Sequence, residues 1–242
     1  MLEAATLPQL AHHLTPGSGP TVVFLPGYAS DMQGTKAIAV EQWAKDNGRA
    51  CLRFDYAGCG ESEGEFEDQT LATWRDDALR MIDTLIDGPV ILVGSSMGGW
   101  IMLLVALARP DRVAAMVGIA PAPDFTDWGY TEPEKATLLA QGRLEQPSQY
   151  GPEPTVTTRA LWESGEANLL MTGPIETDIP VRILHGQHDP DVPWQHSLRL
   201  AEQLRSADVQ LVLIKDGDHR LSRAADIALL LRAIEDVSDR CS

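Results

Sequence analysis

The chain has 242 residues, of which 44% are hydrophobic, and its formal net charge is −16 at pH 7. A charge of this sign opposes binding to phosphate backbones and anionic membrane surfaces, so we do not expect nucleic acid as a partner. The length and the apolar fraction suffice for a sizeable core, and no linker-like stretch divides residues 1–242, which favours a single α/β domain over two small ones.

The cysteines and the first residues bear on the cellular compartment. Cys51, Cys59 and Cys241 are too few and too unevenly spaced for a disulfide framework or a zinc site. The chain does not open with the basic and apolar regions of a secretory signal, and no apolar run approaches the roughly 20 residues of a membrane span. These features predict a soluble cytoplasmic protein with reduced thiols. The oligomeric state is left open.

Short runs rich in Val, Ile and Leu alternate along the chain with longer segments of helical pattern. Near-continuous apolar character indicates strands with both faces covered, and parallel strands need crossovers of about a dozen residues. The pattern therefore predicts an α/β fold with a mostly parallel, doubly wound sheet. In chain order, the expected elements are strand 21–25, helix 35–47, strand 50–54, helix 70–86, strand 90–93, helix 97–108, strand 113–119, strand 181–185, helix 194–205, strand 209–214 and helix 222–237.

Residues 121–179 interrupt this alternation. The segment contains several prolines and modest helical patterns over 134–141 and 157–170, but no convincing core strand. Long insertions of this kind are commonly lids or binding loops, so we predict a small helical cap over the carboxyl edge of the sheet. Its apolar residues could line a pocket or simply pack the cap on the sheet: Phe125, Trp128, Leu138, Leu139, Leu161 and Trp162.

A Gly-x-Ser-x-Gly pattern lies between an expected strand and an expected helix, with Ser96 at its centre. Gly94 and Gly98 leave room for a sharp turn that exposes the serine hydroxyl, and the helix directs its first amides towards it. This context predicts Ser96 as a nucleophile. The neighbouring Ser95 lacks the flanking glycine spacing.

A serine nucleophile needs a histidine base that is oriented by a carboxylate. The loop after strand 181–185 offers Asp189 in a His-Gly-x-x-Asp-x-x-Val-Pro arrangement, with Asp191 as the competitor. The loop after the last expected strand offers His219, which is the only histidine beyond both that acid loop and the last expected strand. The chain order Ser96, Asp189, His219 is the order of nucleophile, acid and base in α/β hydrolases.

Acyl transfer also needs two donors for the oxyanion that develops on the carbonyl oxygen. The backbone N–H of Met97, directly after the nucleophile, is one candidate. The loop after the first strong strand offers the N–H of Tyr28, and Gly27 lets that backbone approach closely. The loop over residues 54–62 lacks the glycine spacing of a dinucleotide site, so neither a cofactor nor a metal is expected.

Several segments together resemble the α/β-hydrolase superfamily with a cap after the sixth strand. Within it they resemble the branch of mitochondrial palmitoyl-protein thioesterases, whose members also cleave acyl glucuronides. The resemblance runs from Thr21 to the last helix, is weakest across the cap, and implies catalytic roles for Ser96, Asp189 and His219. Without an obvious transit peptide, we expect a bacterial relative. The segments are Leu25-Pro-Gly-Tyr, Gly34-Thr-Lys-Ala, Arg53-Phe-Asp-Tyr, Gly94-Ser-Ser-Met-Gly-Gly-Trp, Ala108-Arg-Pro, Val192-Pro-Trp and Asp218-His-Arg.

The function that these residues predict is hydrolysis of acyl esters or thioesters through an acyl-enzyme intermediate. Two alternatives stay open: another reaction of the same triad, such as C–C bond or lactone hydrolysis, and a binding protein on a hydrolase scaffold. An aspartate nucleophile, as in haloalkane dehalogenases and epoxide hydrolases, does not fit a serine at position 96.

Overall fold

The computed structural model describes residues 7–148, 151–152 and 154–241, and its core is a seven-stranded sheet. The strand order is β1-β3-β2-β4-β5-β8-β9, with β1 antiparallel to β3 and the other neighbours parallel. The prediction of a mostly parallel α/β sheet is confirmed. The strands are β1 (His12–Thr15), β2 (Ser18–Leu25), β3 (Arg49–Phe54), β4 (Val90–Ser95), β5 (Val113–Ile119), β8 (Val181–Gly186) and β9 (Val209–Ile214).

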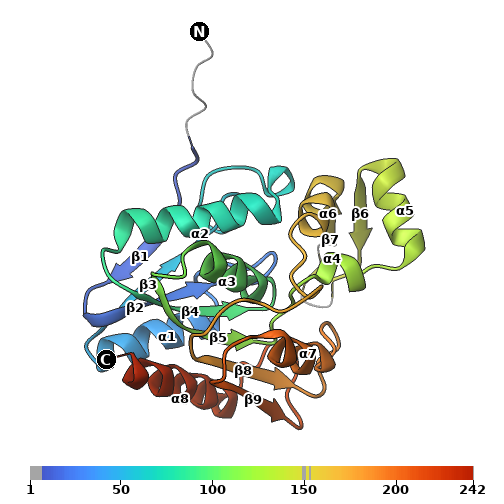
Figure 1. Ribbon diagram of the computed structural model, residues 1–242. Coiled ribbons are helices and arrows are strands. Elements are labelled where there is room, and N and C mark those ends of the chain that lie inside the picture. Colours follow the sequence, from blue (N-terminus) through green and yellow to red (C-terminus); the bar gives the residue numbers. More distant parts are fainter. Residues whose placement is uncertain (1–6, 149–150, 153, 242) are drawn as a thin grey trace.

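Helices cover both faces of the sheet, as Figure 1 shows for α2 and α3 on one side and α1 and α8 on the other. Alternate residues of β2 divide between two buried clusters: Val23 and Leu25 pack with α2 and α3, whereas Val22 and Phe24 pack with α1 and α8. This two-sided burial explains why the strands are apolar throughout. The helices are α1 (Thr35–Asp46), α2 (Leu71–Leu85), α3 (Met97–Ala108), α7 (Gln195–Gln203) and α8 (Ala224–Arg240).

The structure also contains elements that the sequence pattern did not predict. Strand β1 was missed because its four residues, His-His-Leu-Thr, carry little of the apolar character of a strand, and a short 3-10 helix covers Phe66–Asp68. The residues at the start of α2 explain why the helix begins there, because the side chain of the N-cap residue Thr70 accepts a hydrogen bond from the Thr73 N–H in a capping box. None of the helices in the described part of the chain combines the length and hydropathy that a membrane span requires.

Residues 121–179, which we call the cap segment, lie between β5 and β8 and form a separate group of elements at one end of the sheet (Figure 1). Positions 149, 150 and 153 of this expected cap lie outside the described residues. Besides three helices, the segment contains two short strands that pair antiparallel with each other outside the central sheet, which the sequence pattern did not predict. The elements are α4 (Phe125–Trp128), α5 (Glu132–Gln141), β6 (Arg143–Gln146), β7 (Thr155–Thr158) and α6 (Arg159–Glu166).

One contact within the cap segment and two contacts to the core fix its position. Within the segment, the buried Asp124, at a positive φ of 57°, accepts hydrogen bonds from the backbone N–H groups of Leu170 and Met171 at 2.8 and 2.7 Å. The Trp100 indole of α3 donates to the carbonyl oxygen of Asn168. The Trp128 ring stacks on His196 of α7, with the ring centres 4.2 Å apart.

Candidate active site

Ser96 lies at the sharp turn between β4 and α3, with φ 55° and ψ −121°. A positive φ is unfavourable for a residue with a side chain and persists only where the surroundings impose it. The flanking glycines allow it, because a Cβ added at Gly94 would lie 2.4 Å from the carbonyl oxygen of Gly98, and one at Gly98 would lie 2.1 Å from that of Leu25. The Gly-x-Ser-x-Gly spacing is therefore required by backbone contacts on both sides of the serine.

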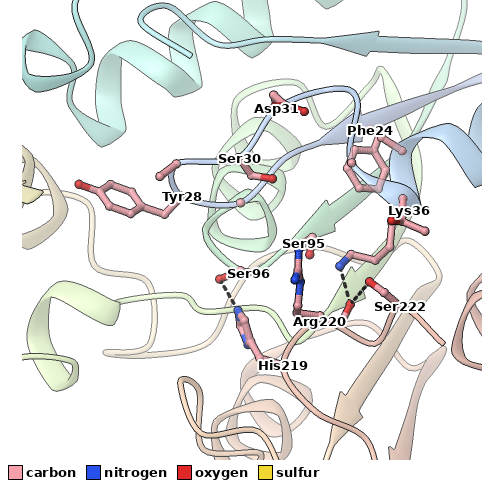
Figure 2. A pocket seen from close by; sticks show the side chains of 15 residues that line it. Phe24, Tyr28, Ser30, Asp31, Lys36, Ser95, Ser96, His219, Arg220 and Ser222 are labelled. Atoms are coloured by element: carbon pink, nitrogen blue, oxygen red, sulfur yellow. Dashed lines mark hydrogen bonds between the residues drawn. The ribbon is translucent and has the colours of Figure 1, made fainter. Parts of the chain in front are cut away.

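The three residues predicted to act together are joined by hydrogen bonds. His219 Nε2 lies 3.1 Å from Ser96 Oγ, and His219 Nδ1 lies 2.8 Å from Asp189 Oδ2. Figure 2 shows the first of these bonds as the dashed line between Ser96 and His219. Because an ionised carboxylate only accepts, His219 Nδ1 carries a proton, and in neutral imidazole Nε2 is then free to accept the serine hydroxyl proton.

Two packed loops bring the acid and the histidine together, although 30 residues separate them. The loops after β8 and β9 touch at Gly186, where an added Cβ would lie 2.3 Å from the carbonyl oxygen of Gly217. The backbone N–H of His188 donates to the same carbonyl oxygen at 2.9 Å. The packing of these two loops against each other thus fixes the distance between Asp189 and His219.

The Asp189 carboxylate is fully buried but has donors on both oxygens. Oδ1 accepts from the backbone N–H groups of Asp191 and Val192 at 2.8 and 2.9 Å, while Oδ2 faces His219 Nδ1 and, at 3.1 Å, His185 Nε2. Burial by itself raises the pKa of Asp189, but the hydrogen bonds from His185, His219 and Val192 outweigh it and hold the pKa well below its usual range. The group is therefore ionised at neutral pH.

The competing residues occupy different positions. Asp191 offers its backbone N–H to Asp189, and its side chain lines the cavity in front of His219. Ser95 is buried at the end of β4. His185, the first residue of the His-Gly-x-x-Asp arrangement, was given no catalytic role from the sequence, and the structure puts it in contact with the acid. The completely buried His185 bridges Ser197 Oγ, 2.7 Å from Nδ1, and Asp189.

The two candidate oxyanion donors lie in the wall of one cavity together with Ser96 and His219. Met97 is the first residue of α3, so its N–H has no acceptor within the helix. The N–H of Tyr28 donates to no acceptor among the described residues. A Cβ added at Gly27 would lie 3.3 Å from Ser96 Cβ, so the Tyr28 loop runs directly beside the serine.

The Tyr28 side chain connects this loop to the cap segment, which sequence reasoning missed. Its hydroxyl donates to the carbonyl oxygen of Val156 in β7, and its ring makes an edge contact with Phe66 at 5.2 Å between centres. Burial, followed by the nearby Tyr130, raises the pKa of Tyr28 far above its usual value, so the hydroxyl stays protonated. Tyr28 thus touches the cap through its side chain while its backbone faces Ser96.

Two cavities open on either side of the Ser96–His219 pair. One, of about 330 Å³, lies under the cap segment and has mainly apolar walls that include Met97, Phe125 and Trp128. The other, of about 230 Å³, lies between the Ser96 turn and the start of α1 and has mainly polar walls. Ser96, His219, Tyr28 and Ala29 belong to both.

The six apolar cap residues considered from the sequence divide into two groups. Phe125 and Trp128 line the cavity under the cap segment. The others do not line it: Leu138 and Leu161 are buried in packing, Leu139 is exposed, and the Trp162 indole donates to the carbonyl oxygen of Thr126. Helical spacing alone could not separate these roles, because packing and pocket residues share it.

One group of ligand-type atoms among the described residues meets the distance condition for a metal ion. Asp189, Asp191 and His219 each place one such atom within 4.8 Å of the others. Two of these residues, Asp189 and His219, are already joined by the hydrogen bond between Oδ2 and Nδ1. A metal here would have to displace the proton between them, so the geometry fits a proton-transfer site better than a metal site.

A family model for the alpha/beta hydrolase fold matches residues 20–139. A human relative, palmitoyl-protein thioesterase ABHD10, mitochondrial, is 43% identical over 245 residues, which cover 100% of this chain and 80% of the relative. The chain belongs to the α/β-hydrolase family, and the resemblance inferred from its motifs is confirmed.

Two solved structures share both fold and sequence with this chain. Alpha/beta hydrolase domain-containing protein 10 from mouse is 41% identical with a TM-score of 0.92, over 100% of this chain and 98% of that chain. The protein in a crystal structure from Agrobacterium vitis S4 is 43% identical in sequence to this chain, with a TM-score of 0.93, over 98% of this chain and 95% of that chain. Similarity to bacterial and animal proteins thus extends over the cap segment as well as the sheet.

The expectation of a cytoplasmic location is wrong in light of these relatives. The curated thioesterases from human, orangutan, cattle and mouse all carry the word mitochondrial in their names. The expectation rested on the lack of a secretory signal pattern in the first residues. The lack of such a pattern does not identify a compartment, because targeting segments are removed from mature proteins.

Proposed function

We propose that this hydrolase cleaves acyl thioesters and esters through a covalent acyl-enzyme on Ser96. The observation that carries the proposal is the chain of contacts Ser96 Oγ–His219 Nε2–Asp189 at 3.1 and 2.8 Å, on a serine held at positive φ. The names of the animal relatives support thioesters, in particular long-chain acyl groups on protein thiols, as the first substrates to examine.

In the first half of the reaction, Ser96 Oγ attacks the acyl carbonyl carbon while its proton passes to His219 Nε2. The negative charge that forms on the carbonyl oxygen is stabilised by the N–H groups of Met97 and Tyr28. A donor of this kind is worth about 10²–10³ in kcat, because it is aimed where the charge develops. The ionised Asp189 stabilises the imidazolium and keeps the proton on Nδ1.

The tetrahedral intermediate then collapses and the bond from carbon to sulfur or oxygen breaks. The leaving group takes the electron pair, and His219 returns the proton from Nε2 to it when it needs one. Water gives a proton to His219 Nε2 and attacks the acyl carbon, and the same donors stabilise the second oxyanion. When this second intermediate collapses, the bond to Ser96 Oγ breaks and His219 returns the proton to Ser96. The products are a carboxylic acid and a thiol or alcohol, and the chain's own residues supply each proton transfer.

The cavity under the cap segment supplies the acyl-binding surface in this scheme. Its walls include the aromatic rings of Phe125, Trp128 and Tyr130, which exclude water from a bound chain. Each buried methylene group contributes about 0.8 kcal/mol, so a longer chain binds more tightly as far as the cavity accepts it. We propose that the cap segment selects the acyl chain and takes no part in the chemical step.

The experiment that tests this function is a kinetic panel of matched thioesters, oxygen esters and lactones with wild type and Ser96→Ala. The expected result is hydrolysis of thioesters and esters, with kcat lowered on the order of 10⁶-fold in the variant. Ser95→Ala is the matched control and retains most of the activity. Hydrolysis of lactones alone would favour the other triad reaction. A folded wild-type protein that hydrolyses nothing and does not react with a fluorophosphonate would favour a binding protein.

A further inference from the structure

The catalytic scheme makes no use of a completely buried histidine beside the triad. His185 is the next-to-last residue of β8, and its side chain has no exposed surface. Both ring nitrogens nevertheless have polar partners, which come from α7 on one side and from the acid loop on the other. A buried polar ring costs free energy unless it has such partners, so the partners decide what the ring can do.

The partners of the His185 ring define which nitrogen carries the proton. Nε2 lies 3.1 Å from Asp189 Oδ2 and 3.0 Å from the carbonyl oxygen of Val192, and both of these atoms are acceptors. Nε2 is therefore the donor, and in a neutral imidazole Nδ1 is then the acceptor. Ser197 Oγ of α7 lies 2.7 Å from Nδ1 and supplies its hydroxyl proton. One neutral tautomer thus satisfies all three partners.

The bond from His185 completes the set of donors around the acid. Oδ1 of Asp189 accepts the backbone N–H groups of Asp191 and Val192. Oδ2 accepts from two rings, those of His219 and His185. An ionised carboxylate has about four lone-pair sites, and these four donors fill them. The carboxylate therefore cannot rotate without losing a hydrogen bond.

His185 also holds the loop that carries the acid. Its second acceptor is the carbonyl oxygen of Val192, the residue whose N–H binds Asp189 Oδ1. The ring stands on a strand of the central sheet and is bound to Ser197, which is itself completely buried on α7. Side chains on strands and helices hold a site more precisely than loop residues do. His185 thus ties Asp189, a loop residue, to regular structure.

We propose that His185 is a positioning residue, which holds the Asp189 carboxylate against His219 and shares the oxygen that His219 binds. The role rests on the proposed function, since it concerns the acid of the same triad. His185 touches neither the substrate nor the reacting atoms. Because two donors on one oxygen compete for its negative charge, Oδ2 holds the His219 imidazolium less strongly than it would with His219 alone.

The groups that titrate around His185 lie on three elements. Asp189 follows β8 and His219 follows β9, while His196 lies on α7 and interacts with His185. Burial, followed by the charge of Arg199, lowers the pKa of His196, so this side chain titrates below an ordinary histidine. A change in pH dependence that follows the His185 donor is therefore assigned to the Asp189–His219 pair.

The pH profile of kcat/KM for 4-nitrophenyl butyrate separates this role from simple packing. His185→Phe keeps a buried ring but removes the donor to Asp189 Oδ2. The carboxylate charge then acts on His219 alone, so we expect the acid limb of the profile to move upward by about one pH unit. On the plateau we expect kcat to fall about tenfold with KM nearly unchanged, because the acid loses part of its orientation.

Three further variants serve as rescue, second probe and control. His185→Gln offers an amide NH2 in place of Nε2 and is expected to restore most of the wild-type profile. Ser197→Ala frees the proton to move to Nδ1, so the acid limb should shift in the same direction by less. Ser238→Ala removes a buried hydroxyl from α8, which carries none of the site residues, and should leave the profile unchanged. Thermal melts show which variants are folded.

Nitrogen-15 NMR of the wild type with labelled histidine rings gives a reading that does not depend on activity. The chain has six histidines, and the signals of His185 are identified by their loss in His185→Gln. We expect a neutral His185 ring with its proton on Nε2 at pH 7.5, where His219 is the base.

The outcomes distinguish this role from the proposed function. A wild type that does not hydrolyse the ester would contradict the proposed function, while the NMR measurement would still test the tautomer of His185. Identical acid limbs in wild type and a folded His185→Phe would overturn the positioning role, and so would an equal shift in Ser238→Ala. If His185→Phe does not fold, an unchanged limb in Ser197→Ala overturns it. A His185 proton on Nδ1 in place of Nε2 would overturn it as well.

Discussion

Replacing Asp189 by asparagine tests how the structure orients its base. The two backbone N–H groups of Asp191 and Val192, 2.8 and 2.9 Å from Oδ1, require an acceptor at that position. The asparagine oxygen must take it, which turns the amide NH2 towards His219 Nδ1. His219 then holds its proton on Nε2 and offers Ser96 a donor in place of an acceptor. The expected loss is about 10⁴-fold in kcat, or about 5.4 kcal/mol of transition-state stabilisation.

The assay is kcat/KM for 4-nitrophenyl butyrate at pH 7.5, with folding followed by thermal melts. Asp191→Asn is the matched control, since it removes the neighbouring carboxylate and leaves the hydrogen bond at 2.8 Å between Asp189 and His219. We expect it to cost less than about tenfold. A larger loss in Asp191→Asn than in Asp189→Asn, with both variants folded, would refute the reasoning and make Asp191 the acid.

Three further predictions concern the cap and the stability of the fold. Trp128→Ala should shift acyl-chain preference in a kcat/KM series while changing kcat for 4-nitrophenyl acetate less than about tenfold; an equal factor at every chain length would contradict this. Tyr28→Phe should destabilise the protein by about 1 kcal/mol in urea, because the half-buried Val156 carbonyl loses its donor; an unchanged midpoint would show that the contact contributes nothing. Burial raises the pKa of Glu41, but hydrogen bonds from Thr15 and Lys45 and the charge of Arg53 outweigh it and lower the pKa to about 2. The ionised Glu41 therefore stabilises the folded protein above about pH 4.3, and this stabilisation is lost as the pH falls towards 2. The stability difference between wild type and Glu41→Gln should therefore vanish over that range of acid unfolding measurements, and a constant difference would be evidence against it.

The features that the sequence predicts well are those with a local physical signature. Alternate residues of β2 and β4 pack against helices on opposite faces, so their apolar runs indicated buried parallel strands. The turn at Ser96 was predictable because two glycines are needed where the backbone approaches within contact distance. The order of the loops after β8 and β9 indicated Asp189 and His219, since parallel strands end at one edge of the sheet.

The features that the sequence did not predict depend on which distant segments meet. The hydroxyl of Tyr28 reaches the carbonyl of Val156, 128 positions away, and Lys36 reaches the carbonyl of Arg220, 184 positions away. A backbone carbonyl leaves no mark on residue type, so neither contact has a signal in the pattern. Strand β6, with the residues Arg-Leu-Glu-Gln, pairs outside the central sheet and carries little β propensity.

The most direct test of the central claim is to trap the acyl-enzyme. A thioester is mixed with the protein, quenched in acid within one turnover, and the modified peptide is located by mass spectrometry. We predict one acyl group on Ser96 that forms at least as fast as kcat, that is absent in Ser96→Ala and that persists in Ser95→Ala. An acyl group on another residue, or turnover without a kinetically competent acyl-enzyme, would contradict the account.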